Sequence, residues 1–411
     1  MTALPPSLLI LGGSTRAAAS SAVRAGFRPI CADRFGDEDL LRLATVLPVR
    51  DYPHGLVEAV QSLSPTPWIY VGALENEPEL IAAISRQHPL LGNSPEVLQR
   101  VRNPFWIERT LRDGKLPALQ NIAEDDLPPS GKQWLKKPLR SGGGIGIRLW
   151  NGARHDGDPK GYFQERRAGR SISAIFIATS LGVHFIGASE QLIGLEAGAP
   201  SEFGYAGSIG PIEVSRNTSH WIQQIGTLLA NESGLRGLFG CDFILVDDVP
   251  WLTEINPRYT ASVEVLERAI SWPLLKWHVL ACLNNMAQLD RELPLTDGAL
   301  ESMAPTSRKT IVGKRIVFSA NDSVAIELEK RVAADSCRPN SIWRMNNEDS
   351  SLADIPAPQS PLFAGWPICT VFACETTVAE CRKVLELRAN AISRWINASM
   401  SSPPPQSSLG H

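Results

Sequence analysis

The sequence has 411 residues, 43% of them hydrophobic, and a formal net charge of −3 at pH 7. This length suggests two or three domains of about 150 residues, and the composition excludes a wholly disordered chain. The small net charge disfavours non-specific binding to nucleic acid or anionic membranes. No apolar run reaches the roughly 20 residues that span a bilayer, and the N-terminus lacks signal-peptide features. The seven cysteines form no C-x-x-C pair, which is typical of reduced thiols and indicates a cytoplasmic protein.

Residues 1–93 have the pattern of a small doubly wound α/β domain. A buried-type strand at 8–11 is followed by a Gly-Gly turn, an Ala-rich helix and a second strand at 28–32. Residues 68–84 repeat the order of strand, loop and helix, which predicts a parallel sheet. Asp33 lies where a dinucleotide fold carries its ribose-binding acid, so an NAD-dependent dehydrogenase is one alternative function.

The rest of the chain alternates helical and extended segments. Residues 94–114 predict a helix interrupted at Pro104, and later helices are expected at 262–270 and 274–288. Between them, short strands separated by glycines predict an antiparallel unit, with segments at 134–138, 144–150, 161–169, 171–178 and 182–192. A Pro- and Asp-rich connector near 291–306 leads to a small α+β unit at 307–397 and a disordered tail at 398–411.

A predicted hairpin brings two acidic residues together. Phe239–Val246 and the later WLTEI have strand composition and flank the turn sequence DDVP. If the turn centres near residue 248, Asp242 pairs with Glu254, where like charges about 5 Å apart are destabilising. Asn256 projects on the same face because strand side chains alternate. Two carboxylates and an amide oxygen suit a hard cation such as Mg²⁺; the alternative is that both acids point into water.

A lysine-bearing strand leads into a glycine loop in WLKKPLRSGGGIGIRLW. Glycines let the backbone approach a ligand closely and turn several N–H groups toward phosphate oxygens. Lys136 and Lys137 point to opposite faces, so only one of them can meet a phosphate, and the strand pattern does not choose between them. The alternative is a flexible hairpin turn. The small residues of this loop are Ser141, Gly142, Gly143 and Gly144.

Three segments, in this order, resemble the ATP-grasp superfamily: KKPLRSGGGIGI as the lid loop, FQERRAG as the adenine hinge and CDFILVDDVPWLTEINPR as the metal hairpin. The resemblance covers about residues 1–397. It implies an α/β and α+β protein with an ATP-grasp fold: a Rossmann-like domain at 1–93, a nucleotide-binding domain at 94–290 with an antiparallel lid at about 131–192, and a C-terminal α+β domain at 307–397. The chain looks closest to predicted carboxylate–amine ligases (carboligases) related to biotin carboxylase-like proteins.

The resemblance also implies roles for individual residues. Lys137 binds phosphates under the lid loop, and Arg258 faces an acyl phosphate or a substrate carboxylate, which suits a guanidinium fork. The implied adenine border is Gln164, Glu165 and Arg166, and the implied ligands of one or two Mg²⁺ (or Mn²⁺) ions are Asp242, Glu254 and Asn256. In VRNPFW an Asp-Lys pair of many members is missing, which leaves Arg102 or Arg100 as a substitute. Arg170-Ser171 stands where many members carry a ribose-binding acid.

The implied activity is ADP-forming ligation, in which ATP activates a carboxylate as an acyl phosphate for attack by an amine. The implied partners are a small carboxylate and a small amine, and a homodimer is the implied assembly. The resemblance to carboligases adds a role in making a pterin- or furan-type one-carbon carrier. Fold position indicates substrate loops near 12–16, 75–76 and 201–211. The alternatives are a biotin-carboxylase-like subunit, an ATP-binding protein without catalysis and the dehydrogenase.

Overall fold

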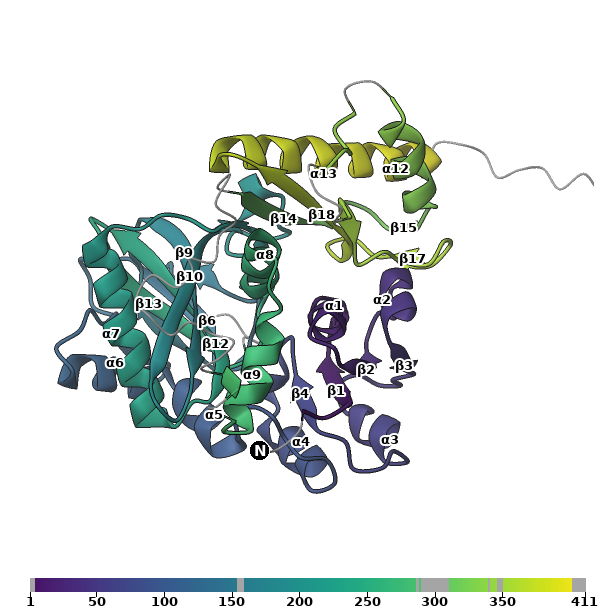
Figure 1. The fold of residues 1–411 in the computed structure, drawn as a ribbon. Helices are drawn as coiled ribbons and strands as arrows, with labels where there is room; N and C mark the ends of the chain where they lie inside the picture. The colour runs from purple at the N-terminus through teal and green to yellow at the C-terminus, as the bar shows by residue number, and fades with distance from the viewer. Residues whose placement is uncertain are drawn as a thin grey trace, which may run out of the picture.

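The computed structural model describes residues 4–153, 159–285, 288–289, 310–338, 341–345 and 350–400 (Figure 1). The strands of these residues form four sheets, of eight, four, four and two strands. Among the same residues, no helix combines the length and the apolar character needed to cross a membrane.

The N-terminal part is the parallel sheet that the sequence predicts. Its strands lie in the order β3-β2-β1-β4. They comprise β1 (Ser7–Gly12), β2 (Arg28–Asp33), β3 (Thr45–Leu47) and β4 (Trp68–Tyr70). Helices pack around it: α1 (Arg16–Arg24), α2 (Glu38–Leu43), α3 (Leu56–Val60) and α4 (Pro78–Ser85). The strand order reverses between β1 and β4, so the loops after these strands flank the crevice where such sheets bind ligands.

Two helices and a small antiparallel sheet follow. The predicted break at Pro104 is confirmed, since α5 (Pro95–Val101) ends before it and α6 (Pro104–Asp113) begins with it. Proline is tolerated there because the first helical N–H has no partner within the helix. The small sheet has the order β5-β8-β6-β7, with β5 at Asn121–Ala123, β6 at Trp134–Pro138, β7 at Arg148–Leu149 and β8 at Gly161–Glu165.

The largest sheet has the order β13-β12-β9-β10-β11-β14-β18-β16. Its strands are β9 (Arg170–Ala178), β10 (Val183–Ile193), β11 (Tyr205–Gly210), β12 (Gly237–Val246), β13 (Val249–Asn256), β14 (Ile311–Phe318), β16 (Leu352–Ala353) and β18 (Pro367–Glu375). The strands predicted between 131 and 192 therefore divide between two sheets. The C-terminal strands continue the sheet of the middle part, through the pairing of β11 with β14.

Helices pack against this sheet and make up the rest of the C-terminal part. Figure 1 shows α13 lying across β14 and β18 at the top of the molecule. The helices are α7 (Arg216–Ser233), α8 (Ala261–Ile270), α9 (Leu274–Cys282), α12 (Leu328–Ser336) and α13 (Val378–Met400). A two-stranded sheet joins β15 (Ser323–Val324) to β17 (Pro361–Leu362).

Two sequence predictions need correction in these regions. The strand expected over 144–150 is reduced to β7, because Gly144 and Gly146 have φ values of +78° and +76° that turn the chain. The helix expected over 274–288 stops at Cys282, and the backbone of Asn284 enters the left-handed region. The connector near 291–306 and most of the tail, 401–411, lie outside the described residues.

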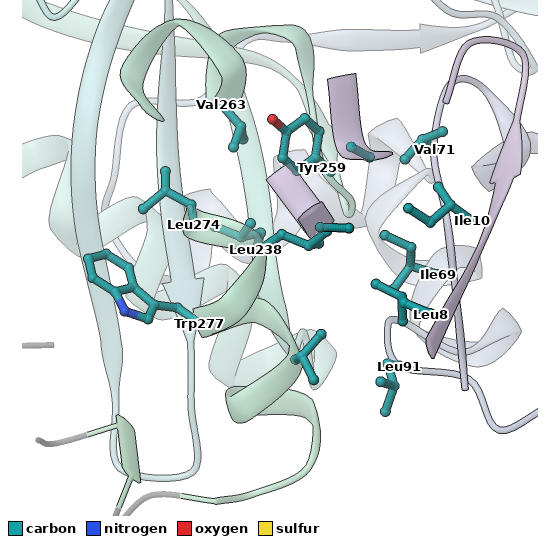
Figure 2. Packing of buried hydrophobic residues seen from close by; sticks show 14 of the residues in the cluster. Leu8, Ile10, Ile69, Val71, Leu91, Leu238, Tyr259, Val263, Leu274 and Trp277 are labelled. Carbon is teal, nitrogen blue, oxygen red and sulfur yellow. The ribbon is translucent and has the colours of Figure 1, made fainter. Parts of the chain in front are cut away.

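A hydrophobic cluster fixes the N-terminal sheet against the middle part. Figure 2 shows Leu8 and Ile10 of β1 on one side of this cluster, and Tyr259 and Val263 beside and on α8 on the other. Burying one such aliphatic side chain contributes roughly 1.5–3 kcal/mol. The ends of β1 and β4 are therefore held in a set position relative to the β12–β13 hairpin.

Buried ion pairs join all three parts of the chain. Arg16 donates from Nη2 to Glu264 Oε2 at 3.1 Å and from Nε to Asp354 Oδ1 at 2.9 Å. Lys314 Nζ lies 2.7 Å from the same Glu264. Arg16 is only 3% exposed and joins the N-terminal sheet to α8 and to the segment after β16; substrate binding by its loop stays a prediction.

Candidate active site

The β12–β13 hairpin pairs Asp242 with Glu254, as the sequence predicts. The turn consists of Asp247 and Asp248, both at positive φ, between the paired residues Val246 and Val249. This turn centres half a residue earlier than expected, and a regular ladder would place Asp242 opposite Thr253. A register shift between Asp242 and Phe243 restores the pairing with Glu254. Such bulges are common beside active sites, where they re-aim side chains.

The two facing carboxyl groups have different protonation tendencies. Burial, and then the charge of Glu254, raise the pKa of Asp242 to about 7. Burial also acts to raise the pKa of Glu254, but the positive charges of Lys137 and Arg102 outweigh it, so the pKa of Glu254 is lowered. Glu254 is therefore the anionic member of the pair, and Asp242 stays protonated up to near-neutral pH.

The chemistry of this donor set fits Mg²⁺. Asp242 and Glu254 supply carboxylate oxygens, and Asn256, whose Nδ2 donates to Asp242 Oδ2 at 3.0 Å, supplies an amide oxygen. Within the described residues there is no group of three or more His, Cys, Asp or Glu side chains suited to a metal. Two carboxylates and one amide are the incomplete oxygen shell that Mg²⁺ usually shares with substrate phosphates.

The structure separates the two lysines of β6. Lys137 Nζ donates to Gln164 Oε1 at 3.1 Å and to the carbonyl oxygen of Thr253 at 3.3 Å. Lys136 points the other way and forms an ion pair with Glu124 at 2.6 Å. Only Lys137 of the two lines the cavity next to the acidic hairpin.

A cavity of about 720 Å³ gathers most of the predicted site residues. Its volume lies within the range of about 300–1,000 Å³ that is usual for small-molecule sites. Those residues are Lys137, Gly143, Gly144, Gln164, Glu165, Arg166, Asp242, Glu254, Asn256 and Arg258. A neighbouring space of about 40 Å³ shares Lys137 and Glu254 with it and is also lined by Arg102, Ser141 and Gly142. The structure thus brings all the sequence-predicted residues together.

Three hydrogen bonds, to two carbonyl oxygens, hold the glycine loop over this cavity. The carbonyl oxygen of Ser141 accepts from Arg102 Nη2 at 2.8 Å and from Asn76 Nδ2 at 3.2 Å. The carbonyl oxygen of Gly143 accepts from the N–H of Tyr205 at 3.0 Å. Of Arg102 and Arg100, it is therefore Arg102 that lies at the site. Arg100 instead donates to the carbonyl oxygen of Ser233 at the end of α7, at 3.2 Å.

Comparison with known proteins identifies the middle part. Residues 103–262 match the family model described as an ATP-grasp domain. These residues are an ATP-grasp domain. The match includes the small sheet, the glycine loop and the β12–β13 hairpin, which together line the cavity.

The whole chain has the fold of the ATP-grasp ligases, enzymes that form carbon–nitrogen bonds. It is similar to a biotin carboxylase complex with β,γ-ATP from Campylobacter jejuni, with a TM-score of 0.66, 12% identity and coverage of 92% of this chain and 89% of the other. It is also similar to an N5-carboxyaminoimidazole ribonucleotide synthetase from Thermotoga maritima, with a TM-score of 0.62, 15% identity and coverage of 94% and 98%. Among curated proteins, the uncharacterized protein MJ0776 of Methanocaldococcus jannaschii is 23% identical, with coverage of 92% of this chain and 91% of that protein.

The hinge of the ATP-grasp domain is tightly bound to its own sheet. The N–H of Glu165 donates to the carbonyl oxygen of Gln120 at 2.8 Å, and the N–H of Arg166 donates to that of Gln133 at 2.9 Å. The carboxylate of Glu165 forms an ion pair with Arg167 at 2.9 Å. The hinge therefore presents a fixed edge to the cavity, and its role as the adenine border stays a prediction.

Arg258 has a partner that sequence reasoning did not assign. Its Nε and Nη2 donate to the two carboxylate oxygens of Glu75, at 2.8 Å and 2.7 Å. Burial acts to raise the pKa of Glu75, but the Arg258 guanidinium outweighs it and the pKa is lowered. Glu75 lies in the 75–76 loop, where its carboxylate orients the arginine at the edge of the cavity; substrate binding by this loop stays a prediction.

Two further polar residues of the site had no signal in the sequence. Ser173 on β9 and Gln191 on β10 hydrogen-bond Asp242 and partly offset the rise in its pKa. They reach Asp242 only because β9 lies between β12 and β10 in the sheet. Such non-local pairing cannot be read from a local pattern.

The geometry of Asp33 disfavours the dehydrogenase. Its Oδ2 accepts from the N–H and the hydroxyl of Thr15 at 2.6 Å and 2.8 Å, and its Oδ1 accepts from the N–H groups of Phe35 and Gly36, both at 2.8 Å. A carboxylate offers about four lone-pair sites, and this one uses four. Asp33 braces the loops of its own sheet and has no capacity left for a ribose.

Proposed function

We propose that the chain is an ADP-forming ligase that joins a small carboxylic acid to a small amine. The observation that carries this proposal is the convergence of Lys137, the Asp242–Glu254 pair and Arg258 on one cavity under the glycine loop. These groups supply positive charge for phosphates, oxygen ligands for a cation and a guanidinium for an acid, which is what carboxylate activation by ATP requires.

The proposed reaction has two steps. A carboxylate oxygen of the acid attacks the γ-phosphorus of ATP, the bond to the β–γ bridging oxygen breaks, and ADP leaves with that electron pair. The amine nitrogen then attacks the acyl carbon, inorganic phosphate leaves with the carbon–oxygen bonding pair, and the nitrogen loses a proton. The products are ADP, phosphate and an amide.

Each side chain has a physical task in this scheme. Lys137 places a point charge beside the phosphates, and Arg258 binds the acid or its phosphorylated form with a planar fork. Asp242, Glu254 and Asn256 would hold Mg²⁺ or Mn²⁺, which neutralises negative charge on bound phosphates. The glycine loop covers the site with backbone N–H groups; Gly144 is required there because a Cβ would lie 1.8 Å from the carbonyl oxygen of Phe203.

Nucleotide product analysis tests the reaction class. The purified chain is incubated with Mg-ATP and a panel of acid–amine pairs, and ADP and AMP are separated and quantified. ADP release that requires both an acid and an amine supports the proposal, whereas AMP release contradicts it. Asp242→Ala and Glu254→Ala should abolish turnover. Asp247→Asn, in the exposed turn of the same hairpin, is the matched control and should retain it.

A finer proposal concerns the substrates and the assembly. The resemblance to carboligases supports an acid or amine from the biosynthesis of a pterin- or furan-type one-carbon carrier, so the panel should include furan and pterin derivatives. A homodimer is proposed from the same resemblance, and the mass measured by light scattering tests it.

Two other functions make different predictions. A biotin-carboxylase-like subunit, supported by the similarity in fold, would release ADP when given bicarbonate and free biotin without an amine. An ATP-binding protein without catalysis is supported by Arg102, because its Nη2 is already bonded to Ser141 and Asn76. That protein would bind Mg-ATP in a dialysis experiment and release no ADP with any pair.

A further inference from the structure

A cation framed by aromatic rings lies on the surface between the N-terminal sheet and the C-terminal part. The guanidinium carbon of Arg34 is 4.8 Å from the ring centroid of Trp366, 5.7 Å from that of Phe35 and 5.8 Å from that of Tyr52. Trp366 also meets Phe363 edge-on, with 5.2 Å between their centroids. We call Arg34, Phe35, Tyr52, Phe363 and Trp366 the aromatic clamp.

The clamp exposes groups that proteins usually cover. Phe35 and Trp366 are each 42% exposed and Phe363 is 46% exposed, although they come from distant parts of the sequence. Among the described residues, no carboxylate forms a hydrogen bond or ion pair with Arg34. A group of exposed rings around a guanidinium that has no carboxylate partner in the described part of the chain is unusual for surface that meets only water.

The turn that carries Arg34 is rigid. Asp33 binds the N–H groups of Phe35 and Gly36 with Oδ1 and the Thr15 loop with Oδ2. Gly36, at a φ of +64°, completes the turn. Arg34 and Phe35 are therefore presented from a preformed frame at the carboxyl end of β2, which reduces the ordering cost of binding a ligand.

The clamp is connected to the ATP-grasp cavity. The hydroxyl of Tyr52 lies 3.5 Å from the carbonyl oxygen of Gly72, in the loop after β4. Three residues later in this loop, Glu75 holds Arg258 at the cavity edge. The clamp and the cavity edge thus both contact the loop after β4.

We infer that the aromatic clamp binds a planar aromatic carboxylate, and that this is part of a substrate of the ligase. The role as substrate rests on the proposed function; the binding site does not. An aromatic ring can stack on Trp366 and Phe35. Its carboxylate can then accept hydrogen bonds from the planar guanidinium of Arg34.

Equilibrium dialysis of the full chain tests the clamp with 2-naphthoate as the probe. Neutral 2-naphthamide and non-aromatic cyclohexanecarboxylate are the comparison ligands. The intact protein should bind 2-naphthoate about tenfold more tightly than either, because only this probe uses both the rings and the charge. Arg34→Met and Trp366→Leu should each weaken binding by about tenfold. Arg86→Met, an exposed arginine on the same domain, is the control and should leave the Kd unchanged.

The outcomes test the binding site at the clamp and the proposed ligase function separately. Equal affinity for the three probes, or an unchanged Kd in Arg34→Met, overturns the clamp. A change in oligomeric mass in Trp366→Leu also overturns it and assigns the rings to a contact between copies. Mg-ATP is dialysed in parallel: if it fails to bind while 2-naphthoate binds, the proposed ligase function fails and the site remains. If Mg-ATP binds and 2-naphthoate does not, the clamp alone fails.

Discussion

Arg258, just after the β12–β13 hairpin, and Glu75, in the loop after β4, form a two-pronged ion pair, with N–O distances of 2.8 Å and 2.7 Å. The side chain of Glu75 is 1% exposed and that of Arg258 is 13% exposed. The guanidinium at the cavity edge is therefore oriented by a residue from the loop after β4 of the N-terminal sheet. The site is complete only when the N-terminal sheet is docked.

Glu75→Gln should separate positioning from nucleotide binding. The amide keeps the size but loses the charge that fixes Arg258, so the KM for the acid should rise by roughly tenfold while the Kd for Mg-ATP stays unchanged. Steady-state kinetics and nucleotide dialysis measure the two effects. Weaker Mg-ATP binding with an unaltered KM would contradict a positioning role.

A stability measurement serves as the control for this pair. Arg258→Met leaves Glu75 as an uncompensated buried charge and should lower the free energy of unfolding by about 3–5 kcal/mol. The double variant Glu75→Gln/Arg258→Met should recover most of that loss in urea unfolding, while remaining inactive. A double variant as unstable as Arg258→Met would show that the ion pair is not the cause.

The neighbouring lysines of β6 offer a matched pair of variants. Lys137→Met removes the charge beside Gln164 and Thr253 and should weaken Mg-ATP binding by about 10- to 100-fold, the usual range for one charge-assisted contact. Lys136→Met removes an equal charge on the opposite face, where it pairs with Glu124, and should change the Kd less than about threefold. Nucleotide dialysis of both variants decides the point; similar losses in both would mean that only the total charge of the strand matters.

The raised pKa of Asp242 predicts a pH dependence for stability. In the folded protein this pKa is about 7, against 3.8 for an ordinary aspartate, so the folded state binds the proton more tightly than the unfolded state does. Without a metal, the free energy of unfolding should therefore fall as the pH rises from 3.8 to about 7. Asp242→Asn should remove this component and be more stable than the parent protein at pH 8. Urea unfolding of the parent protein and of Asp242→Asn, with a chelator present at about pH 5 and pH 8, measures this component. An equal loss of stability between the two pH values in both proteins would refute the prediction.

The same proton predicts how metal affinity depends on pH. Mg²⁺ can use the Asp242 carboxylate only after the proton leaves, so below about pH 7 its affinity should rise by up to about tenfold per pH unit and then level off. Calorimetric titrations in buffers of different ionisation enthalpy would detect the released proton. Binding that is independent of pH would place the cation elsewhere.

Local sequence patterns predict the individual elements of this molecule better than they predict its sheet topology. The β1–α1–β2 unit and the break at Pro104 follow from apolar runs and proline chemistry, which act within a few residues. The Asp242–Glu254 pairing was predicted correctly from a turn placed half a residue too late, because a bulge that leaves no sequence signal makes up the difference. The strand pattern leaves open the choice of Lys137 over Lys136, which only the family resemblance makes, and nothing in the sequence predicts the continuation of the large sheet through β14, since both depend on partners far away in the sequence.

The contacts of Arg102 predict a role in closing the site. Its Nη2 bonds the carbonyl oxygen of Ser141 in the glycine loop at 2.8 Å and Asn76 Oδ1 at 2.9 Å, so it holds the loop to the N-terminal domain. Arg102→Met should weaken Mg-ATP binding by about tenfold and make the loop more sensitive to protease in the presence of nucleotide. Arg100→Met loses only the contact with Ser233, so it should bind Mg-ATP and resist protease as well as the parent protein does. Because Arg102→Lys keeps the charge but loses the two-way fork, it should retain affinity for phosphate and lose protection of the loop. If Arg102→Lys loses both the affinity for phosphate and the protection of the loop, Arg102 acts on the nucleotide alone and does not hold the glycine loop in place.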